Sequence, residues 1–348
     1  MIISQQKITP KISDLLAIFT SNHNQNILKR WIPKNNHYWT GSGRESLTQI
    51  LLNLNIKNVG VPAYTCHVVT DAVKRAGKNV VYYDSGVIAN IKDIKKNIKK
   101  IDALIVSYNF GFMPDMDQIV KLCKKNKIIL IEDCAQALGA TYKDKLAGSF
   151  GDYAFYSFGI SKNIGFCGGL IASNKKLKIT NLKPYPFKKL ATLILKIIIA
   201  PIFFNRMVYP FTSKLLTQEL KKKQENLPYF LPKIAKKIIL RQLWQYNSIL
   251  KTRRKNANYL IKKLKGTMKF VNPLPKTNPS WLYLVIYGNE DFRKKMLMKN
   301  VEFGRMLTFK ALDSKKENAE FSEKNVLTIA LYRNPVEMRY IIKRLKNE

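Results

Sequence analysis

Hydrophobic and polar residues alternate along the first half of the chain in a pattern that predicts a sheet covered by helices. Short apolar runs rich in β-branched residues indicate buried strands, and the stretches between them carry apolar residues at helical spacing. The expected strands are 58–61, 80–83, 103–108, 128–132, 152–157 and 169–172, and the expected helices are 45–54, 67–76, 91–100 and 115–125. Because continuously apolar strands are typical of parallel sheets, the pattern predicts an α/β fold whose central sheet is mostly parallel and flanked by helices.

The second half of the chain has a different organisation. A long helical pattern fills residues 232–265, and a strand-like run follows at 280–288. A helix is expected over 290–298, a strand over 326–331 and a closing helix over 335–346. We therefore expect three parts: an N-terminal segment (1–34), a large domain (35–231), and a connecting helix with a smaller α+β domain (232–348).

The longest apolar stretch, Leu190–Phe204, has fifteen residues and includes Lys196 and Pro201. A helix that spans a bilayer needs about 20 apolar residues, so no transmembrane segment is expected. Two interpretations remain. The stretch is either an apolar core helix in the connection between the domains, which we favour, or a helix that lies on an anionic membrane with Lys188 and Lys189 beside it.

Charge changes the range of expected partners. The 348 residues include 61 Lys and Arg against 23 Asp and Glu, a formal net charge of +38, and most of the excess lies after residue 170. Such a surface attracts nucleic acid, anionic lipid headgroups or phosphorylated substrates, unless it is only a solvated lysine-rich face. Since no nucleic-acid-binding motif accompanies the charge, nucleic acid is not an expected partner.

Cysteine and histidine usage narrows the chemistry. The four cysteines are widely separated and form no C-x-x-C pair, which excludes a zinc ribbon and a disulfide framework and favours a reducing cytoplasm. With three histidines in the whole chain, a multi-histidine metal centre is not expected. The start of the chain lacks the apolar region and cleavage site of a signal peptide, so a cytoplasmic location is expected, with the inner face of the membrane as a peripheral alternative.

The densest group of chemical signals lies between residues 128 and 169. Glu132 and Asp133 end an apolar strand, at the edge of a parallel sheet where ligands bind. Ser157 precedes Lys162 by five residues, and small and apolar residues surround the lysine. Pyridoxal phosphate needs a lysine amine, an acidic partner for its ring nitrogen and donors for its phosphate. Lys162, Asp133 and Ser157 offer all three.

A second segment, GSGRESL at 41–47, opens an expected helix. Backbone N–H groups at a helix N-terminus, together with the helix dipole, hold phosphate groups. Taken alone this signal is weak, because small residues commonly precede helices.

The chain resembles the DegT/DnrJ/StrS family of pyridoxal-phosphate-dependent sugar aminotransferases. The resemblance covers most of the chain and rests on IEDCAQALGATY from residue 131 and GSFGDYAFYSFGISKNIG from residue 148, in that order and spacing. The helix start at Gly43 and the ILRQL segment of the long helix also look like the family. The resemblance implies the aspartate-aminotransferase-like fold type I, with a large cofactor-binding domain, a smaller C-terminal domain and a homodimer that shares its active sites.

The resemblance also implies roles for individual residues. Lys162 matches the lysine that binds the cofactor covalently and later moves the catalytic proton. Asp133 matches the carboxylate that keeps the ring nitrogen protonated, and Gln136 matches a contact to the ring's 3-oxygen. Ser157 matches a phosphate-binding hydroxyl, and Gly43, Arg44 and Glu45 match the helix start whose amides hold the phosphate.

The sequence departs from the family at two positions. Cys66 stands where many members carry an aromatic residue that stacks on the cofactor ring, so Cys66 packs there more loosely or the stacking face comes from His67 or Tyr64. Cys167 replaces the usual acidic residue before the Gly pair. The retained Lys162 separates the chain from family dehydratases, which carry histidine at that position.

The expected function is transfer of an amino group, with L-glutamate as the expected donor, to a nucleotide-linked keto-sugar in amino-sugar or polysaccharide synthesis. Two alternatives stay open. One is a pyridoxal-phosphate enzyme with another reaction, such as dehydration or epimerisation. The other is a non-catalytic regulator that keeps the fold and uses its positive charge to bind nucleic acid or a membrane.

Overall fold

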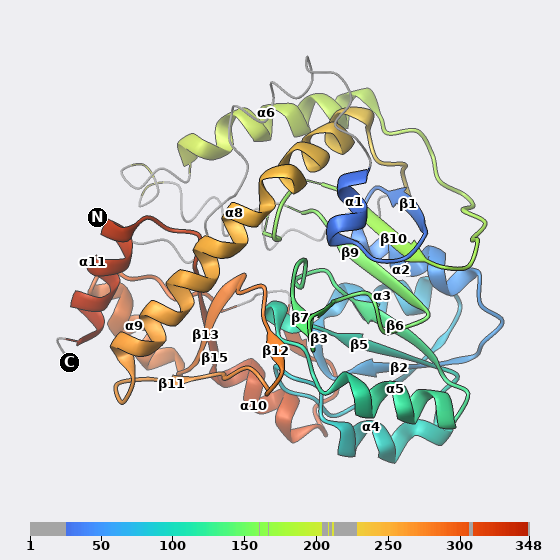
Figure 1. Ribbon diagram of the computed structural model, residues 1–348, viewed down its shortest axis with the longest axis horizontal. Coiled ribbons are helices and arrows are strands. Elements are labelled where there is room, and N and C mark those ends of the chain that lie inside the picture. Colours follow the sequence, from blue (N-terminus) through green and yellow to red (C-terminus); the bar gives the residue numbers. More distant parts are fainter. Residues whose placement is uncertain are drawn as a thin grey trace.

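The computed structural model describes residues 26–159, 161–165, 167–203, 208, 211, 228–305 and 309–346. Its centre is a seven-stranded sheet in the order β1-β10-β9-β6-β5-β2-β4 (Figure 1). These strands are β1 (Asn36–Thr40), β2 (Asn58–Pro62), β4 (Asn79–Tyr83), β5 (Ala103–Ser107), β6 (Ile129–Asp133), β9 (Tyr153–Ser157) and β10 (Gly169–Ser173). Four of the six neighbouring pairs are parallel, whereas β10 runs antiparallel to both β9 and β1. The predicted mostly parallel α/β sheet is confirmed, with β1 as a strand that the pattern did not predict.

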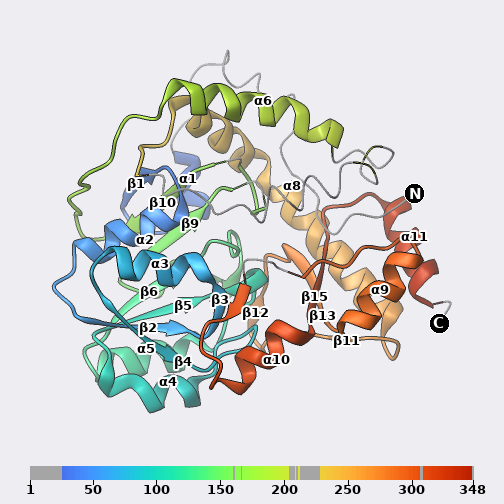
Figure 2. The same cartoon turned by 180° about the vertical axis from the view of Figure 1, so that it is seen from behind.

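Helices cover both faces of this sheet (Figures 1 and 2). On one face lie α2 (Gly43–Leu52) and α3 (His67–Arg75), and on the other lie α4 (Ile91–Asn97), its continuation η2 (Ile98–Lys100) and α5 (Met116–Lys125). Successive residues of β5 serve the two cores in turn: Ile105 packs with the α2 and α3 side chains, whereas Leu104 and Val106 pack with those of α4 and α5. This alternation is why the strand is apolar throughout.

The C-terminal part is tied to the sheet by one long helix. The first half of α8 (Lys233–Leu264) packs with α1 (Asn26–Trp31) in the core of the large sheet, and its second half joins a second core. That second core surrounds a small antiparallel sheet in the order β11-β13-β15. Its elements are β11 (Lys269–Phe270), β13 (Tyr283–Tyr287), β15 (Val326–Ala330), α9 (Glu290–Met298), α10 (Glu317–Asn325) and α11 (Pro335–Lys346).

Two further small sheets join the halves of the chain. In one, β3 (Tyr64–Cys66) pairs with β14 (Phe309–Ala311). In the other, β12 (Thr277–Asn278) pairs with β7 (Thr141–Tyr142), which also pairs with β8 (Lys145–Leu146). A single 3-10 turn, η3 (Asn109–Gly111), follows β5. These pairings hold the C-terminal part against the end of the large sheet at which β5 and β6 finish.

The apolar stretch near residue 190 forms α6 (Phe187–Phe203). The expectation that this helix is part of the core is wrong, because none of its described side chains is buried. Only one side of α6 is partly covered, where Leu193 packs on Ile238 of α8. The stretch is helical as its pattern predicts, but α8 covers only one side of the helix. No helix among the described residues combines the length and apolar character needed to cross a membrane.

Glu132 fastens the loop after β8 to the central strand. Its Oε2 accepts hydrogen bonds from the Tyr108 hydroxyl and the Gly148 amide, both at 2.7 Å. Its Oε1 accepts from the amides of Phe150 at 2.7 Å and Gly151 at 2.6 Å. Complete burial raises the pKa of Glu132, and these donors oppose that rise. One carboxylate therefore satisfies four buried donors.

Glu132→Ala should lower the free energy of unfolding by roughly 3–5 kcal/mol, because it leaves four buried donors without an acceptor. Urea unfolding followed by circular dichroism measures this change. Glu320→Ala, at an exposed carboxylate on α10, is the control and should change stability by less than about 0.5 kcal/mol. A similarly small effect at Glu132 would show that the loop is held by other contacts.

Candidate active site

Three polar side chains stand at the carboxyl ends of adjacent strands. Ser107 ends β5, Asp133 ends β6 and Ser157 ends β9, and Ser107 is the direct register partner of Asp133. Side chains alternate along each strand, and Ile105, Ile131 and Phe155, two residues earlier, all pack on the α2 and α3 face. The three polar side chains therefore share that face, at the sheet edge where parallel folds bind ligands.

Asp133 is the buried charge of this edge, with 8% of its surface exposed. Its Oδ2 accepts a hydrogen bond from Ser107 Oγ and its Oδ1 accepts from the Ala135 amide, each at 3.0 Å. Ser107 Oγ in turn lies 3.3 Å from Thr65 Oγ1 of β3. Burial raises the pKa of Asp133, while the Ala135 amide, the positive charge of Lys162 and the Ser107 hydroxyl oppose that rise.

Lys162 lies in the turn between β9 and β10, on the same side of the sheet edge as Asp133. Its side chain is half-buried, and its backbone amide donates to the Gly159 carbonyl at 2.9 Å. Its ammonium is close enough to Asp133 to stabilise the ionised carboxylate. The fold therefore brings together the lysine and the acid that the sequence pattern singled out.

The turn that carries Lys162 is held from the C-terminal half of the chain. On one side of the lysine, the Tyr283 hydroxyl of β13 donates to the Ser161 carbonyl at 3.3 Å. On the other side, Arg253 Nη2 of α8 donates to the Asn163 carbonyl at 3.1 Å. The Asn163 side chain donates to the Tyr246 hydroxyl at 2.8 Å. Both carbonyls that flank Lys162 are thus fixed by elements far away in sequence.

Arg253 is 1% exposed, and no ion pair to a carboxylate reaches it among the residues described. Burial lowers the pKa of Arg253, and tyrosine side chains, foremost Tyr246 and Tyr283, oppose that lowering. A buried cation without a carboxylate costs stability. Its contact with the turn of Lys162 is the role that the structure shows for it.

Gln136 is buried beside this edge. Its Oε1 accepts from the Phe110 amide at 2.6 Å, and its backbone carbonyl accepts from Ser280 Oγ at 2.8 Å. Because an N–H donor faces one end of the side-chain amide, that end must be the oxygen. The other end, Nε2, is buried and has no hydrogen-bond partner among the described residues. Gln136 Nε2 is therefore available to donate a hydrogen bond to a bound ligand.

The N-terminus of α2 lies directly against Ser157. A Cβ atom added at Gly43 would come within 2.8 Å of the Ser157 Cβ atom, so only glycine allows this approach. Ser42 caps the helix by accepting the Glu45 amide on its Oγ at 3.1 Å. The first amides of α2, at Gly43 and Arg44, lie in the turn beside the Ser157 hydroxyl. A helix N-terminus and a hydroxyl in this arrangement suit a phosphate group.

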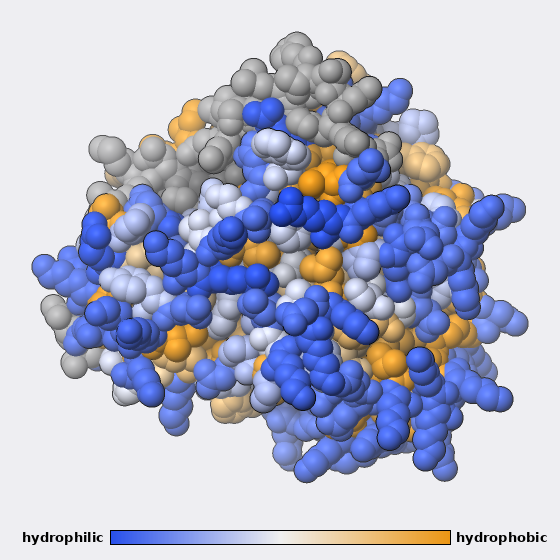
Figure 3. Space-filling view, viewed as in Figure 1, coloured by the Kyte–Doolittle hydropathy of each residue, from blue (hydrophilic) through white to orange (hydrophobic). Residues whose placement is uncertain are grey.

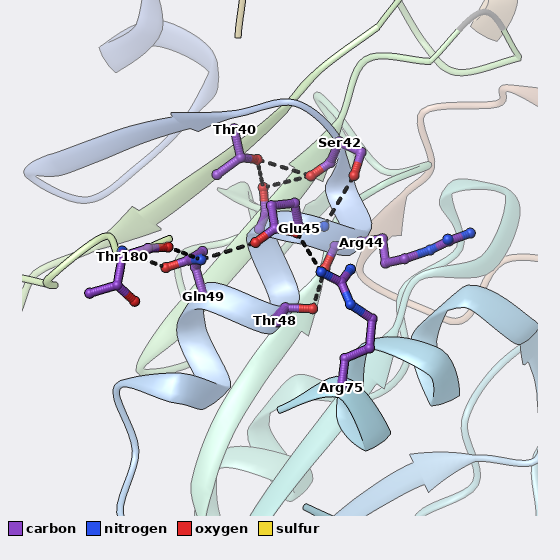
Figure 4. Close-up of polar contacts among 9 residues, drawn as sticks. Thr40, Ser42, Arg44, Glu45, Thr48, Gln49, Arg75 and Thr180 are labelled. Atoms are coloured by element: carbon purple, nitrogen blue, oxygen red, sulfur yellow. Dashed lines mark hydrogen bonds and ion pairs between the residues drawn. The ribbon is translucent and has the colours of Figure 1, made fainter. Parts of the chain in front are cut away.

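Glu45 stabilises the start of α2 and does not contribute to the phosphate cradle, the name used here for the α2 N-terminus at Gly43 and Arg44 with the Ser157 hydroxyl (Figure 4). Its buried carboxylate accepts from Arg75 Nη2 and from Gln49 Nε2, each at 3.0 Å, and its amide is already used by Ser42. We therefore correct the expectation that its amide holds a phosphate. The Arg44 side chain points away from this cluster, and burial lowers the pKa of Arg44 while Asp71 and Cys66 oppose that lowering.

Cys66 and His67 occupy the junction between β3 and α3, and both are half-buried. Cys66 is the register partner of Phe309 in β14, so the C-terminal half closes over this junction. Tyr64 is buried against Phe309 with ring centroids 5.6 Å apart, which assigns it to the core rather than to a ring-stacking role. Cys66 and His67 remain the predicted residues on this side of the site.

The residues present fit pyridoxal phosphate. The missing Cβ of Gly43 lets the first turn of α2 approach Ser157, which brings the helix N-terminus beside the Ser157 hydroxyl as a phosphate cradle requires. Gln136 Nε2 is a buried donor without a partner, as a contact to a ring oxygen requires. Asp133 supplies a buried carboxylate for a protonated ring nitrogen, and Lys162 supplies the amine beside it.

Comparison with known proteins agrees with this geometry. Residues 28–188 match the model of the DegT/DnrJ/EryC1/StrS aminotransferase family. The match spans 161 of the 348 residues, a little less than half of the chain. The matched range contains the site residues from β3 to the Lys162 turn, and it excludes those from the C-terminal half, such as Arg253 and Tyr283.

Among curated relatives, the GDP-perosamine synthase of Escherichia coli O157:H7 is 35% identical over 143 residues, which are 39% of this chain and 39% of that protein. The alignment thus spans about two-fifths of that protein's length.

Solved structures extend the likeness of fold to the whole chain. A putative sugar aminotransferase from Streptococcus pneumoniae, in its PMP form, has a TM-score of 0.76 at 17% identity and covers 100% of this chain and 97% of its own. An E. coli GDP-4-keto-6-deoxy-D-mannose-3-dehydratase with bound hydrated PLP has a TM-score of 0.74 at 18% identity. The alignment covers 99% of this chain and 100% of the dehydratase chain. At these identities the comparison shows the fold, which a putative sugar aminotransferase and a dehydratase both have.

Several residues of the site escaped the sequence pattern. Ser107 could have been found, because it ends an apolar strand beside that of Asp133 and such positions face ligands. Thr65, Arg253 and Tyr283 carry no local signal. They reach the site only through β3, α8 and β13, whose positions depend on tertiary packing.

Arg253→Met should lower the affinity of Lys162 for pyridoxal phosphate while leaving the free energy of unfolding nearly unchanged. The free energy of unfolding should stay within about 1 kcal/mol of the parent, because loss of one hydrogen bond is offset by removal of a buried charge. The apparent affinity for pyridoxal phosphate at Lys162, measured by visible absorbance across a pH series, should fall about tenfold, which is ~1.4 kcal/mol. Arg253→Lys, which keeps a donor for the Asn163 carbonyl, should recover part of it. Parent-like affinity in the Met variant would contradict a positioning role.

Proposed function

We propose that the protein is a pyridoxal-phosphate-dependent aminotransferase. The observation that carries this proposal is the position of the Lys162 charge near the buried Asp133 at the carboxyl end of the sheet, where Gly43 and Ser157 form the expected phosphate cradle. The family match over residues 28–188 supports it. The PMP and PLP forms named for the two solved structures support the cofactor.

Each residue has a defined task in this proposal. When bound, the cofactor supplies a protonated ring that accepts electrons from the reacting carbon. Asp133 holds the proton on the ring nitrogen, since its carboxylate is anchored by Ser107 and Ala135. Gln136 Nε2 donates to the ring oxygen, and Ser157 Oγ with the first amides of α2 binds the phosphate. Lys162 Nζ holds the cofactor at rest and, once released, moves the proton between donor and cofactor.

We propose a nucleotide-linked keto-sugar as the amino acceptor and L-glutamate as the donor. The acceptor class is supported by the name of the GDP-perosamine synthase relative. It is also supported by the chain's net charge of +38, which attracts a diphosphate to the site. We also propose that the protein forms a homodimer. Each chain would consist of a large domain (35–231) and a smaller C-terminal domain (232–348), which meet at Lys162.

A dehydratase is the second candidate, because a solved dehydratase shares the fold. Lys162 favours transamination over dehydration. The resemblance to the family places histidine at this position in dehydratases, and a histidine offers no primary amine to hold the cofactor.

We place the activity in the cytoplasm. All four cysteines are free, and Cys123 and Cys134 are buried within one core, as expected of thiols in a reducing compartment. The positive charge favours a site at the inner face of the membrane, where anionic lipids gather.

The direct test uses purified protein with pyridoxal phosphate. The visible absorbance of the lysine-bound cofactor should form in the parent and should change when L-glutamate is added. Lys162→Ala should show neither signal, and glutamate turnover should fall at least 10³-fold because the proton carrier is lost. Lys145→Ala, at an exposed lysine of β8, is the matched control and should behave as the parent. Turnover by Lys162→Ala at the parent rate would refute the proposed function.

Cofactor affinity should depend on pH through Asp133. Burial raises the pKa of Asp133 above its ordinary value of 3.8, so the carboxylate should be lost as the pH falls through that raised pKa and be present above it. Affinity for pyridoxal phosphate should therefore fall on the acid side. Asp133→Asn should lower affinity about 100-fold at neutral pH and abolish that acid limb, because no carboxylate remains to titrate. An unchanged acid limb in Asp133→Asn would assign the titration to another group.

A further inference from the structure

The outer surface of α6 carries a stripe of apolar side chains. We define this α6 stripe as Phe187, Ala191, Leu195, Ile198 and Ile202. Their spacing of four, four, three and four residues places them on one face of the helix. All five are exposed, with 82% of Phe187, 54% of Leu195, 43% of Ile198 and 55% of Ile202 accessible.

The other side of α6 is anchored, which fixes the direction of the stripe. Leu193 of α6 and Ile234 of α8 pack on Ile238, which is buried. The views from the front and the back both place α6 along the outer edge of the molecule, beyond the first half of α8 and away from the small sheet (Figures 1 and 2). The stripe therefore faces outward from a helix that is held in place.

The surroundings of the stripe are positively charged. Lys188 and Lys189 lie in the first turn of α6, and Lys233, Lys236 and Lys237 begin the neighbouring α8. Between residues 174 and 288 the whole sequence holds only two acids, Glu219 and Glu225. On the face drawn in Figure 3, hydrophilic side chains predominate and apolar patches lie between them. An apolar stripe within a basic surface suits a partner that has an anionic surface layer over an apolar interior.

Aromatic side chains lie next to the first turn of α6. Tyr185 and Tyr229 are half-buried with ring centroids 5.6 Å apart, and the Lys189 ammonium lies 5.5 Å from the Tyr229 ring centre. Tyrosine and lysine side chains of this kind are enriched at the level of lipid headgroups, where an apolar body meets a polar tip.

We propose that α6 docks the protein on an anionic lipid surface, with the α6 stripe inserted at the headgroup boundary. The helix lies on the membrane rather than crossing it, because its 17 residues span only about 25 Å and include Pro201. A second copy of the chain is a poorer partner for the stripe. Two copies joined there would bring two sets of lysines together with few acids to offset their repulsion.

Flotation of the full chain with vesicles tests this proposal without using catalysis, so it stands or falls apart from the proposed activity. The parent should bind vesicles of equimolar phosphatidylglycerol and phosphatidylcholine at least about tenfold more tightly than pure phosphatidylcholine, and high salt should weaken binding. The triple variant Leu195→Gln, Ile198→Gln, Ile202→Gln should lose at least about tenfold of that affinity. Met298→Gln, at an exposed apolar residue of α9 outside the stripe, is the control and should bind as the parent.

Three results would overturn the proposal. The parent could fail to bind anionic vesicles, or the triple variant could bind them as tightly as the parent, which would assign binding to charge alone. In the third, sedimentation would show a parent dimer that the triple variant loses, so that a second copy covers the stripe. Circular dichroism and a urea midpoint equal to the parent's establish that the triple variant is folded.

Discussion

The site depends on one buried carboxylate. Asp133 ends a central strand in a position where burial raises its pKa, and the Ala135 amide, the charge of Lys162 and the Ser107 hydroxyl oppose that rise. A buried charge without such partners would be neutralised or would destabilise the fold. The placement of β5 beside β6, together with the Lys162 turn, therefore supplies the partners that offset the burial of this carboxylate.

Because side chains alternate along a strand, the adjacent acids Glu132 and Asp133 face opposite sides of the sheet and have different partners. Glu132 faces the α5 and α8 side, where four protein donors consume its oxygens. Asp133 faces the α2 and α3 side, where its partners leave it beside the phosphate cradle. The start of α2 shows a similar separation: Gly43 lets the helix approach Ser157, whereas Glu45 hydrogen-bonds to Arg75 and Gln49.

Much of this could be predicted from sequence because the signals are local. Apolar runs located six of the seven central strands. The order of motifs singled out Lys162, Asp133, Gln136, Ser157 and Gly43 as candidates, and the structure brings Gly43 against Ser157 and the charge of Lys162 near Asp133. The contributions of Arg253 and Tyr283 could not be predicted, since each acts across more than 85 residues through packing. The burial of α6 was predicted wrongly for a related reason. A helical period identifies an apolar face, but only the packed structure shows whether another element covers it.

The central claim is that Lys162 is the amine that holds pyridoxal phosphate in a chain with 61 basic residues. Borohydride reduction of the protein with bound cofactor, followed by peptide mapping, measures which lysine carries the fixed cofactor. The geometry around Asp133 predicts a single stoichiometric adduct on Lys162. An adduct spread over surface lysines, or fixed on another residue, would contradict it.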